Sequence, residues 1–350
     1  MKKNYPEITR LRGMAIIMVL LYHSILVFPI NLHEIEWCKN LHTLLWYVQM
    51  PLFFLVSGFC YSYTGSYFKY FLKKAKRILI PHLIFGLADM TLRVLPSYIP
   101  ELAGMVNQKV TFKEAIVSFF LYGGEDPFLR SLFIMSVTFP LVAWIMNRGM
   151  LGKTVAFTGA GLAFLFQNSI TNIQCLDYIS SFLVYYVIGY WCKNAHYETI
   201  KKKLLSTNAL LGGIVLLAVG SILVCNHIAT GISLPFGMIS VLKLWGVLIA
   251  IGGALIVYRF CAHMGGFADN IFTAAGKYSL TMYLLCGYAL VVSRTIIVGK
   301  LGITTPVMVI VFNFLVDFVV LWFISRYVIK PCRFLCFICG MNYEKKNKKR

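Results

Sequence analysis

Residues 10–24 read RLRGMAIIMVLLYHS, in which a basic start leads into an apolar helix that carries one histidine deep inside it. Arg12 and His23 are eleven positions apart. At 100° per residue they return to within about 20° of one helix face, roughly 16 Å apart along the axis. Such a helix places a cation at a membrane surface and an imidazole near mid-bilayer. Because an ionisable group inside a membrane is costly, His23 is a candidate functional residue; the alternative is a histidine that only bonds a neighbouring helix.

The composition indicates a protein with many membrane-spanning helices. Of the 350 residues, 59% are hydrophobic and 15% aromatic, and the mean hydropathy is +0.74. These values leave too little polar surface to cover a soluble globule. The net charge of +20 comes from short Lys and Arg clusters between apolar runs, which is the pattern of cytoplasmic loops and not of a nucleic-acid-binding surface. We therefore expect membrane lipids, and no nucleic acid, as partners.

The apolar windows predict an all-α, polytopic bundle of about ten transmembrane helices. Each window has roughly the 20 apolar residues that a ~30 Å hydrocarbon core requires. The first window is expected to be a retained span and not a cleaved signal peptide, because no small-residue cleavage site follows it. The predicted helices are 12–31, 44–64, 78–98, 128–147, 151–170, 174–192, 208–227, 236–258, 276–297 and 305–328.

The distribution of charge predicts that both termini are cytoplasmic. With that orientation, 25 of the 33 Lys and Arg residues fall in cytoplasmic segments, against four in the outer loops. This is the positive-inside bias of a multi-pass protein, expected here in the plasma membrane. Residues 99–127 form the longest outer segment and are too polar to span, so an external lid or a surface helix is expected there.

Two windows carry unusual residues. The second contains WYVQMPLFFLVSGFCY at 46–61, where Pro51 and Gly58 interrupt an apolar helix and let a partner backbone or a ligand come close. The third follows YFKYFLKKAKRILIPH at 67–82, whose positive face suits the inner leaflet or an anionic cytosolic ligand. Further along the third window, Asp89 and Arg93 are one turn apart, and we predict that they pair.

The cysteines indicate neither a disulfide framework nor a metal site. Ten cysteines are scattered, mostly in apolar segments, so free thiols are expected. Cys336 and Cys339 form a CxxC, but without a second pair of ligands it favours reduced or lipidated thiols over zinc. Walker, GxSxG, HExxH and GxGxxG motifs are absent from the sequence, which leaves ATP-driven transport and protease chemistry without support.

Four motifs, taken in order, resemble a known family. Arg12 and His23, with ten residues between them, are followed by MPLFFLVSGF at 50–59, KRILIP at 76–81 and GKYSLTMYLL at 276–285. Across ten spans this order resembles the membrane acyltransferase family 3, bacterial integral-membrane O-acyltransferases that modify surface glycans. The MPLFF form resembles the fucose O-acetylase-like branch. The resemblance covers nearly the whole chain, with residues 1–335 as the acyltransferase domain and 336–350 as a basic cytoplasmic tail.

The resemblance implies an O-acyltransferase, expected to be an O-acetyltransferase. Cytoplasmic acyl-CoA, here acetyl-CoA, would be the co-substrate, and a hydroxyl of a cell-surface or lipid-linked glycan would be the acceptor. No permanently bound cofactor and no metal are implied. The family's catalytic histidine falls on His23. Donor binding is expected of Arg12, Arg10 and Arg77, and shaping of the active site is expected of Ser57, Gly58, Phe59, Pro51 and Gln49.

The chemistry of these residue types agrees with that expectation. Acyl transfer to a hydroxyl needs a general base, which a neutral imidazole supplies, and a positioned base is typically worth ~10²–10⁴ in rate. An arginine presents forked donors that match the phosphate oxygens of coenzyme A. Because Arg12 and His23 share one helix face, we expect the donor and the base to share a single cavity.

Three departures from the family pattern keep other functions open. Relatives often have histidine where this chain has Gln49 and Cys286, and the segment that begins at Pro127, PFLRSLF, lacks the usual tryptophan. A specialised acceptor or a reduced activity is compatible with these changes. The competing hypotheses are a transporter or flippase, in which His23 relays protons, and a non-catalytic membrane partner or sensor. The absence of detectable inverted halves weighs against a transporter.

Overall fold

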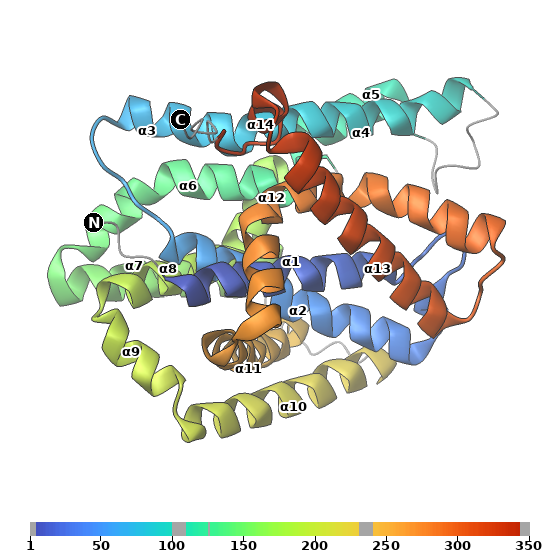
Figure 1. Ribbon diagram of the computed structural model, residues 1–350. Coiled ribbons are helices and arrows are strands. Elements are labelled where there is room, and N and C mark those ends of the chain that lie inside the picture. The colour runs from blue at the N-terminus through green and yellow to red at the C-terminus, as the bar shows by residue number, and fades with distance from the viewer. Residues whose placement is uncertain (1–4, 100–109, 125–126, 231–240, 344–350) are drawn as a thin grey trace, which may run out of the picture.

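The computed structural model describes residues 5–99, 110–124, 127–230 and 241–343, and these are helical without strands (Figure 1). The α-helices are α1 (Pro6–Ser24), α2 (Glu36–Phe59), α3 (Tyr67–Lys74), α4 (Ile80–Tyr98), α5 (Phe112–Val117), α6 (Pro127–Met146), α7 (Gly149–Leu165), α8 (Leu176–Asn194), α9 (Tyr197–Leu204), α10 (Thr207–Thr230), α11 (Val241–His263), α12 (Gly266–Arg294), α13 (Pro306–Phe323) and α14 (Arg333–Ile338). Short 3₁₀ turns are η1 (Leu32–Glu34), η5 (Gln167–Ser169) and η6 (Ile173–Cys175). Segments of π-helix are η2 (Ala75–Leu79), η4 (Ser118–Tyr122), η7 (Thr295–Lys300) and η8 (Ile324–Ile329).

Every predicted window contains a helix, so the all-α prediction is confirmed. By length and composition, seven helical segments among the described residues could cross a membrane, against the ten that the sequence predicts. The seven are Glu36–Phe59, Tyr67–Tyr98, Phe112–Met146, Thr207–His227, Leu242–His263, Gly266–Lys300 and Pro306–Ile329. The predicted spans that correspond to α1, α7 and α8 form helices but are not among them.

The first helix begins and ends earlier than predicted. α1 starts at Pro6 and ends at Ser24, not at residue 31. A helix that continued to residue 31 would have to pass through Pro29, and the residue before a proline is disfavoured in the α region. His23 therefore lies in the last turn of α1 and not deep inside the helix. The imidazole of His23 therefore lies at the carboxyl end of α1, one residue before the helix ends.

α1 lies inside the bundle and packs directly on α12 (Figure 1). A Cβ added at Gly13 would collide with the carbonyl of Phe272, and one at Gly276 would collide with the carbonyl of Thr9. Glycines at these positions let the two backbones touch, as small residues do between membrane helices. α12 thus carries GKYSLTMYLL along the side of α1.

The cytoplasmic end predicted for α1 is fixed by polar contacts. Lys201 of α9 lies 2.7 Å from the buried Glu7, and the Tyr197 hydroxyl donates to the same carboxylate oxygen at 2.8 Å. The Arg10 Nε donates to Asp269 Oδ1 at 2.6 Å, and its Nη1 donates to the Cys261 carbonyl at 3.1 Å. These bonds set the position of α1 along its axis, and with it the heights of Arg12 and His23.

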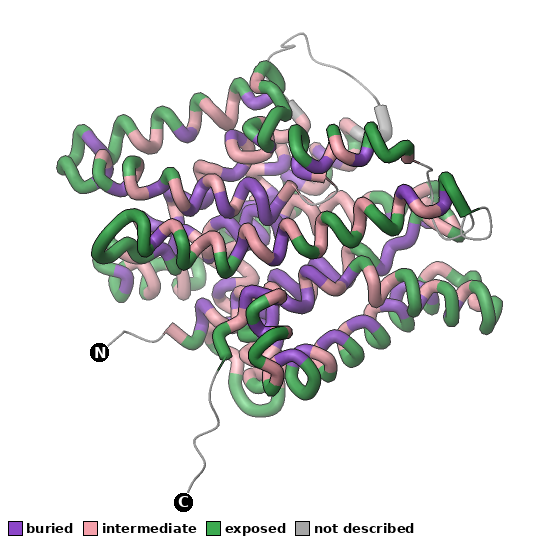
Figure 2. Tube along the Cα trace, turned by 90° about the horizontal axis from the view of Figure 1, so that it is seen from above, coloured by how far each residue is buried: buried purple, intermediate pink, exposed green. Residues whose placement is uncertain are grey.

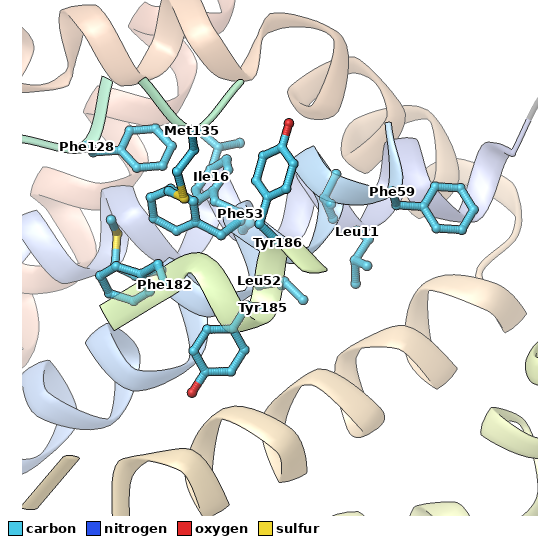
Figure 3. Close-up of a cluster of buried hydrophobic side chains, with 14 of the residues drawn as sticks. Leu11, Ile16, Leu52, Phe53, Phe59, Phe128, Met135, Phe182, Tyr185 and Tyr186 are labelled. Atoms are coloured by element: carbon cyan, nitrogen blue, oxygen red, sulfur yellow. The ribbon is translucent and has the colours of Figure 1, made fainter. Parts of the chain in front are cut away.

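The α2–α8 contact is the second close approach. A Cβ at Gly58 would collide with the Tyr186 carbonyl, and one at Gly189 would collide with the Leu55 carbonyl. Around this contact, Phe54 and Phe182 stack with ring centroids 4.8 Å apart. Figure 3 shows this aromatic core, and Figure 2 shows that buried residues gather along the inner helices. Of the two sequence interpretations of Gly58, the structure displays the approach of a partner backbone.

We predict that Gly58→Leu destabilises the protein by about 3 kcal/mol or prevents folding, because the added side chain would overlap backbone atoms of Tyr186 and not the end of a flexible side chain. Thermal melting and size-exclusion elution in detergent measure the effect. Gly159→Leu on α7, where a Cβ meets nothing within 4 Å, is the matched control and should melt within a few degrees of the wild type. A stable but inactive Gly58→Leu protein would assign this glycine to the active site and not to packing.

The segment predicted as an outer lid is partly helical and leads into a broken span. Within 99–127, residues 112–122 form α5 and η4, which lie beside α4 (Figure 1), while 100–109 and 125–126 lie outside the described residues. After η4 the chain turns through Gly123 (φ +91°) and Gly124 (φ +67°) into α6. The Phe120 carbonyl accepts from Arg130 Nη1 at 2.9 Å and from Gln174 Nε2 at 2.8 Å. Side-chain donors of this kind make a broken helix tolerable at membrane depth.

The last described residues pack on the bundle. α14 contains the predicted domain boundary at 335/336, and a Cβ at Gly340 would collide with the Arg77 carbonyl. Cys336 and Cys339 are free and buried. Burial raises the pKa of the Cys339 thiol to about 11 and raises that of Cys336 as well, which disfavours the reactive thiolate. Within the described ranges, no three His, Cys, Asp or Glu side chains form a group that could hold a metal.

Candidate functional site

Two pockets share one tyrosine in their linings. The first, the cationic pocket, has a volume of about 490 Å³ and the second, the histidine pocket, about 370 Å³. Tyr283 of α12 lines both. Its ring packs on Phe128 with centroids 4.9 Å apart, and Phe128 also lines the cationic pocket. The single cavity expected from the sequence is thus two pockets with a shared aromatic wall.

The cationic pocket gathers positive side chains from five parts of the chain. It is lined by Arg12 of α1, Lys74 of α3, Arg77 of η2, Lys277 of α12 and Lys330, which follows η8. No Asp or Glu is among its described lining residues. A concave site with five cations and no carboxylate favours an anionic ligand, and phosphate groups match the arginine forks best.

Of the three arginines predicted to bind the donor, Arg12 and Arg77 line this pocket and Arg10 does not. Arg77 is exposed, and Arg12 donates from Nη2 to the thiol of Cys60 at 3.2 Å. Arg10 instead forms its ion pair with Asp269, outside both pockets. Lys74, Lys277 and Lys330 belong to the site although the sequence reasoning did not select them.

The lining of the cationic pocket is polar as well as aromatic. Ser136, Tyr186 and Thr281 are buried and line the cationic pocket, and Figure 3 labels Tyr186 within the aromatic core. The hydroxyl of Thr281 has no hydrogen-bond partner among the described residues. A buried hydroxyl without a partner is destabilising by itself, so this one is available to a polar group of a ligand.

The predicted shaping residues divide into one lining residue and four packing residues. Ser57 lines the cationic pocket. Phe59 packs edge-on against Tyr5 and Tyr197, with centroids 5.2 and 4.9 Å away. Pro51 and Gln49 are buried in α2 and line neither pocket. These three, with Gly58, set the position of α2 and so act on the pockets through the fold.

His23 lines the histidine pocket. It is exposed, and the space that it faces is this pocket. Its ring lies edge-on to Tyr22 at 5.1 Å, and within the described part of the chain it forms no hydrogen bond to protein. The alternative interpretation was a histidine that only bonds a neighbouring helix. The structure shows no such bond among the described residues. An imidazole with both nitrogens open can accept a proton from a bound hydroxyl.

The rest of this pocket provides polar and aromatic surfaces for a ligand. Arg93 donates from Nε to Asp89 Oδ2 at 3.0 Å, which confirms the predicted pair, and both residues line the pocket. Phe85 and Tyr288 add aromatic faces, and Cys286, one of the departures from the family pattern, also lines it. Charged and aromatic groups side by side suit a ligand with many hydroxyls and an apolar ring face.

A second histidine was missed by the sequence reasoning. His82, close to the start of α4, lines the same pocket as His23 and accepts from Arg130 Nε at 3.3 Å. Its ring stacks on Phe119 with centroids 5.5 Å apart. His82 comes directly after Pro81, the last residue of the KRILIP motif, so it stood next to a residue pattern already noted. Nothing in the spacing along the chain connected it with His23.

Comparison with known families gives one finding. The family model described as an acyltransferase domain, that of membrane acyltransferase family 3, matches residues 5–328. The matched range contains every lining residue of the histidine pocket. It contains those of the cationic pocket except Lys330, Gly340, Met341 and Asn342. Neither the curated proteins nor the solved structures gave a match.

Proposed function

The chain belongs to the membrane acyltransferase family 3, and we propose that it is an O-acetyltransferase that moves an acetyl group from acetyl-CoA to a hydroxyl of a cell-surface or lipid-linked glycan. It is an acyltransferase with membrane-spanning helices. The observation that carries the finer proposal is the pair of pockets, one cationic and one lined by His23, that meet at Tyr283. Such a pair suits a reaction between an anionic donor and a neutral, hydroxylated acceptor.

In this proposal the cationic pocket binds the donor. Coenzyme A carries its phosphates at one end and its thioester at the other. Arg12 and Arg77 bind phosphate oxygens, and the pantetheine arm extends toward Tyr283, so that the thioester reaches the wall between the pockets. The lysines of the pocket add charge without the directional fork of arginine.

The histidine pocket binds the acceptor. An aromatic face such as Tyr288 packs on the apolar side of a sugar ring, and Asp89 and Arg93 bond its hydroxyls. His23 then takes the proton of the reacting hydroxyl as general base. The oxygen attacks the acyl carbon, the C–S bond breaks, and the proton leaves on the sulfur of coenzyme A. The products are the acyl ester and free coenzyme A.

The test is transfer of label by the purified protein in vesicles. Acetyl-CoA carrying ¹⁴C in the acetyl group is supplied on the side of the cationic pocket, with cell-envelope glycans or lipid-linked saccharides on either side. We expect label in ester linkage that mild alkali releases. A transporter or flippase would move the acceptor without esterifying it, and a non-catalytic partner would do neither, so either result would overturn the proposal.

The charge distribution adds a prediction about orientation. Residues 4 and 350 lie outside the described residues, and both are expected in the cytosol because 25 of 33 cations then fall on the inner side. Reporter fusions at the two termini should give a cytosolic signal. An external signal at either end would place the cationic pocket away from cytosolic coenzyme A and remove the donor assignment.

A further inference from the structure

His82 is a buried histidine with a nitrogen that no protein group satisfies. Only 1% of its surface is exposed, and it lines the histidine pocket with His23. Its Nδ1 has no hydrogen-bond partner among the residues that the structure describes. Buried polar nitrogens are nearly always paired, so an unpaired one in a pocket wall is available to a group that enters the pocket.

The partner of its other nitrogen determines where the ring proton lies. Arg130 donates from Nε to His82 Nε2 at 3.3 Å. Because a guanidinium only donates, Nε2 must be the acceptor, and the proton of the neutral ring is on Nδ1. Nε2 is occupied and Nδ1 already holds a proton, so His82 cannot serve as a base. It can donate a hydrogen bond, which is the opposite of the role proposed for His23.

The surroundings hold this donor in one orientation. The His82 ring stacks on Phe119 with an interplanar angle of 21°, and the Arg130 guanidinium lies 5.5 Å from the centre of the same Phe119 ring. Arg130 is fixed in turn by the Phe120 carbonyl at 2.9 Å. A donor that is already oriented needs no rearrangement when charge develops next to it, and its bond to a cation strengthens the donation.

Two helical segments repeat the same layout. On α1, Arg12 lines the cationic pocket and His23 lines the histidine pocket. On the continuous segment η2–α4, Arg77 lines the cationic pocket and His82 lines the histidine pocket. Each segment thus pairs an arginine of the cationic pocket with an imidazole of the histidine pocket, and Tyr283 lines both pockets. A group transferred past Tyr283 enters a pocket with one histidine that accepts a proton and one that donates a hydrogen bond.

We propose that His82 is a second catalytic residue, which donates a hydrogen bond from Nδ1 to the carbonyl oxygen of the acyl group. The inference rests on the proposed function. When His23 removes the proton of the acceptor hydroxyl, the new C–O bond forms and the π electrons of the carbonyl move onto its oxygen. The Nδ1–H of His82 stabilises this oxyanion. The oxyanion then collapses, the C–S bond breaks, and the sulfur of coenzyme A takes the electron pair and the proton held by His23.

The experiment compares three variants in the label-transfer assay with acetyl-CoA and an accepting glycan. His82→Phe keeps the stacked ring and removes the donor, so kcat should fall about 10²–10³-fold, while the KM values of both substrates stay within about threefold. His82→Asn keeps an N–H near the position of Nδ1 and should recover at least tenfold in kcat over the phenylalanine variant. His33→Phe, at a histidine that lines neither pocket, is the matched control and should keep the wild-type kcat.

The outcomes separate the possible explanations. A wild-type kcat in His82→Phe overturns the inference and leaves the proposed function standing. Equal losses in the phenylalanine and asparagine variants, together with lower melting temperatures, assign His82 to packing and also overturn it. If the phenylalanine variant does not fold, the asparagine variant decides, and a loss above a hundredfold in its folded form counts against the inference. A wild type that transfers no label to any glycan overturns the proposed function and this inference with it.

Discussion

Replacing His23 with glutamine should abolish acyl transfer while the protein stays folded. Glutamine keeps a polar side chain but cannot take a proton at neutral pH, so the loss should reach about 10²–10⁴ in kcat, the range for a positioned base. Alanine should be equally inactive. The imidazole forms no hydrogen bond to protein within the described residues, so its removal leaves no buried group unpaired. Label transfer and thermal melting of the same preparations measure both quantities.

The controls for this prediction are a second histidine and the pH profile. His263→Gln, at an exposed histidine whose Nδ1 contacts only the Arg259 carbonyl of its own helix, should keep full activity. Because only the neutral imidazole accepts a proton, the wild-type rate should rise with pH through one ionisation and then level. A glutamine variant with most of the wild-type rate would make His23 a structural residue and remove the base from the proposed mechanism.

Arg12→Ala should raise the KM for acetyl-CoA by about tenfold to a hundredfold and leave kcat nearly unchanged. The guanidinium lines the cationic pocket and His23 lines the other one, so in the proposed mechanism Arg12 binds phosphate and does not touch the reacting atoms. A charge-assisted hydrogen bond is worth about 1.5–3 kcal/mol, which corresponds to that range of KM. Steady-state kinetics with varied acetyl-CoA provide the measurement.

Two further substitutions make the result specific. Arg12→Lys should recover only part of the affinity, because an ammonium group replaces a fork that matches phosphate. Arg148→Ala removes an arginine that lies over the Trp144 ring at 4.1 Å, outside both pockets, and should leave the donor KM as in the wild type. Equal donor KM values for wild type, Arg12→Ala and Arg12→Lys would exclude Arg12 from the donor site.

The glycines and prolines of the sequence showed where helices bend or touch but not which helices meet. Gly58 could serve a ligand or a neighbouring backbone, and only the packed bundle shows the Tyr186 carbonyl against it. The reason is that a contact between helices far apart in the chain depends on their relative position and rotation, which no local pattern encodes. The same holds for Gly13 and Gly276, whose mutual approach sets α12 beside α1.

The sequence by itself determined that the protein is a helical membrane bundle, since continuous apolar windows have no other stable form in a membrane. It also determined that Arg12 and His23 share one side of a helix, because eleven residues are close to three turns. Local spacing likewise predicted the Asp89–Arg93 pair, which the structure contains.

Only the tertiary structure decided what these residues face. It brought Lys277 and Lys330 to Arg12, placed Arg10 on Asp269, and divided the expected single cavity at Tyr283. It also brought His82 into the pocket of His23. The π-helical turn at Ala75–Leu79 adds a residue to one turn and rotates all that follows, so a regular helical count from Arg77 could not predict the direction of His82. Groups from distant segments converge only when the helices pack together. The arrangement of lowest free energy depends on contacts among all the helices, so the local spacing of residues does not reveal it.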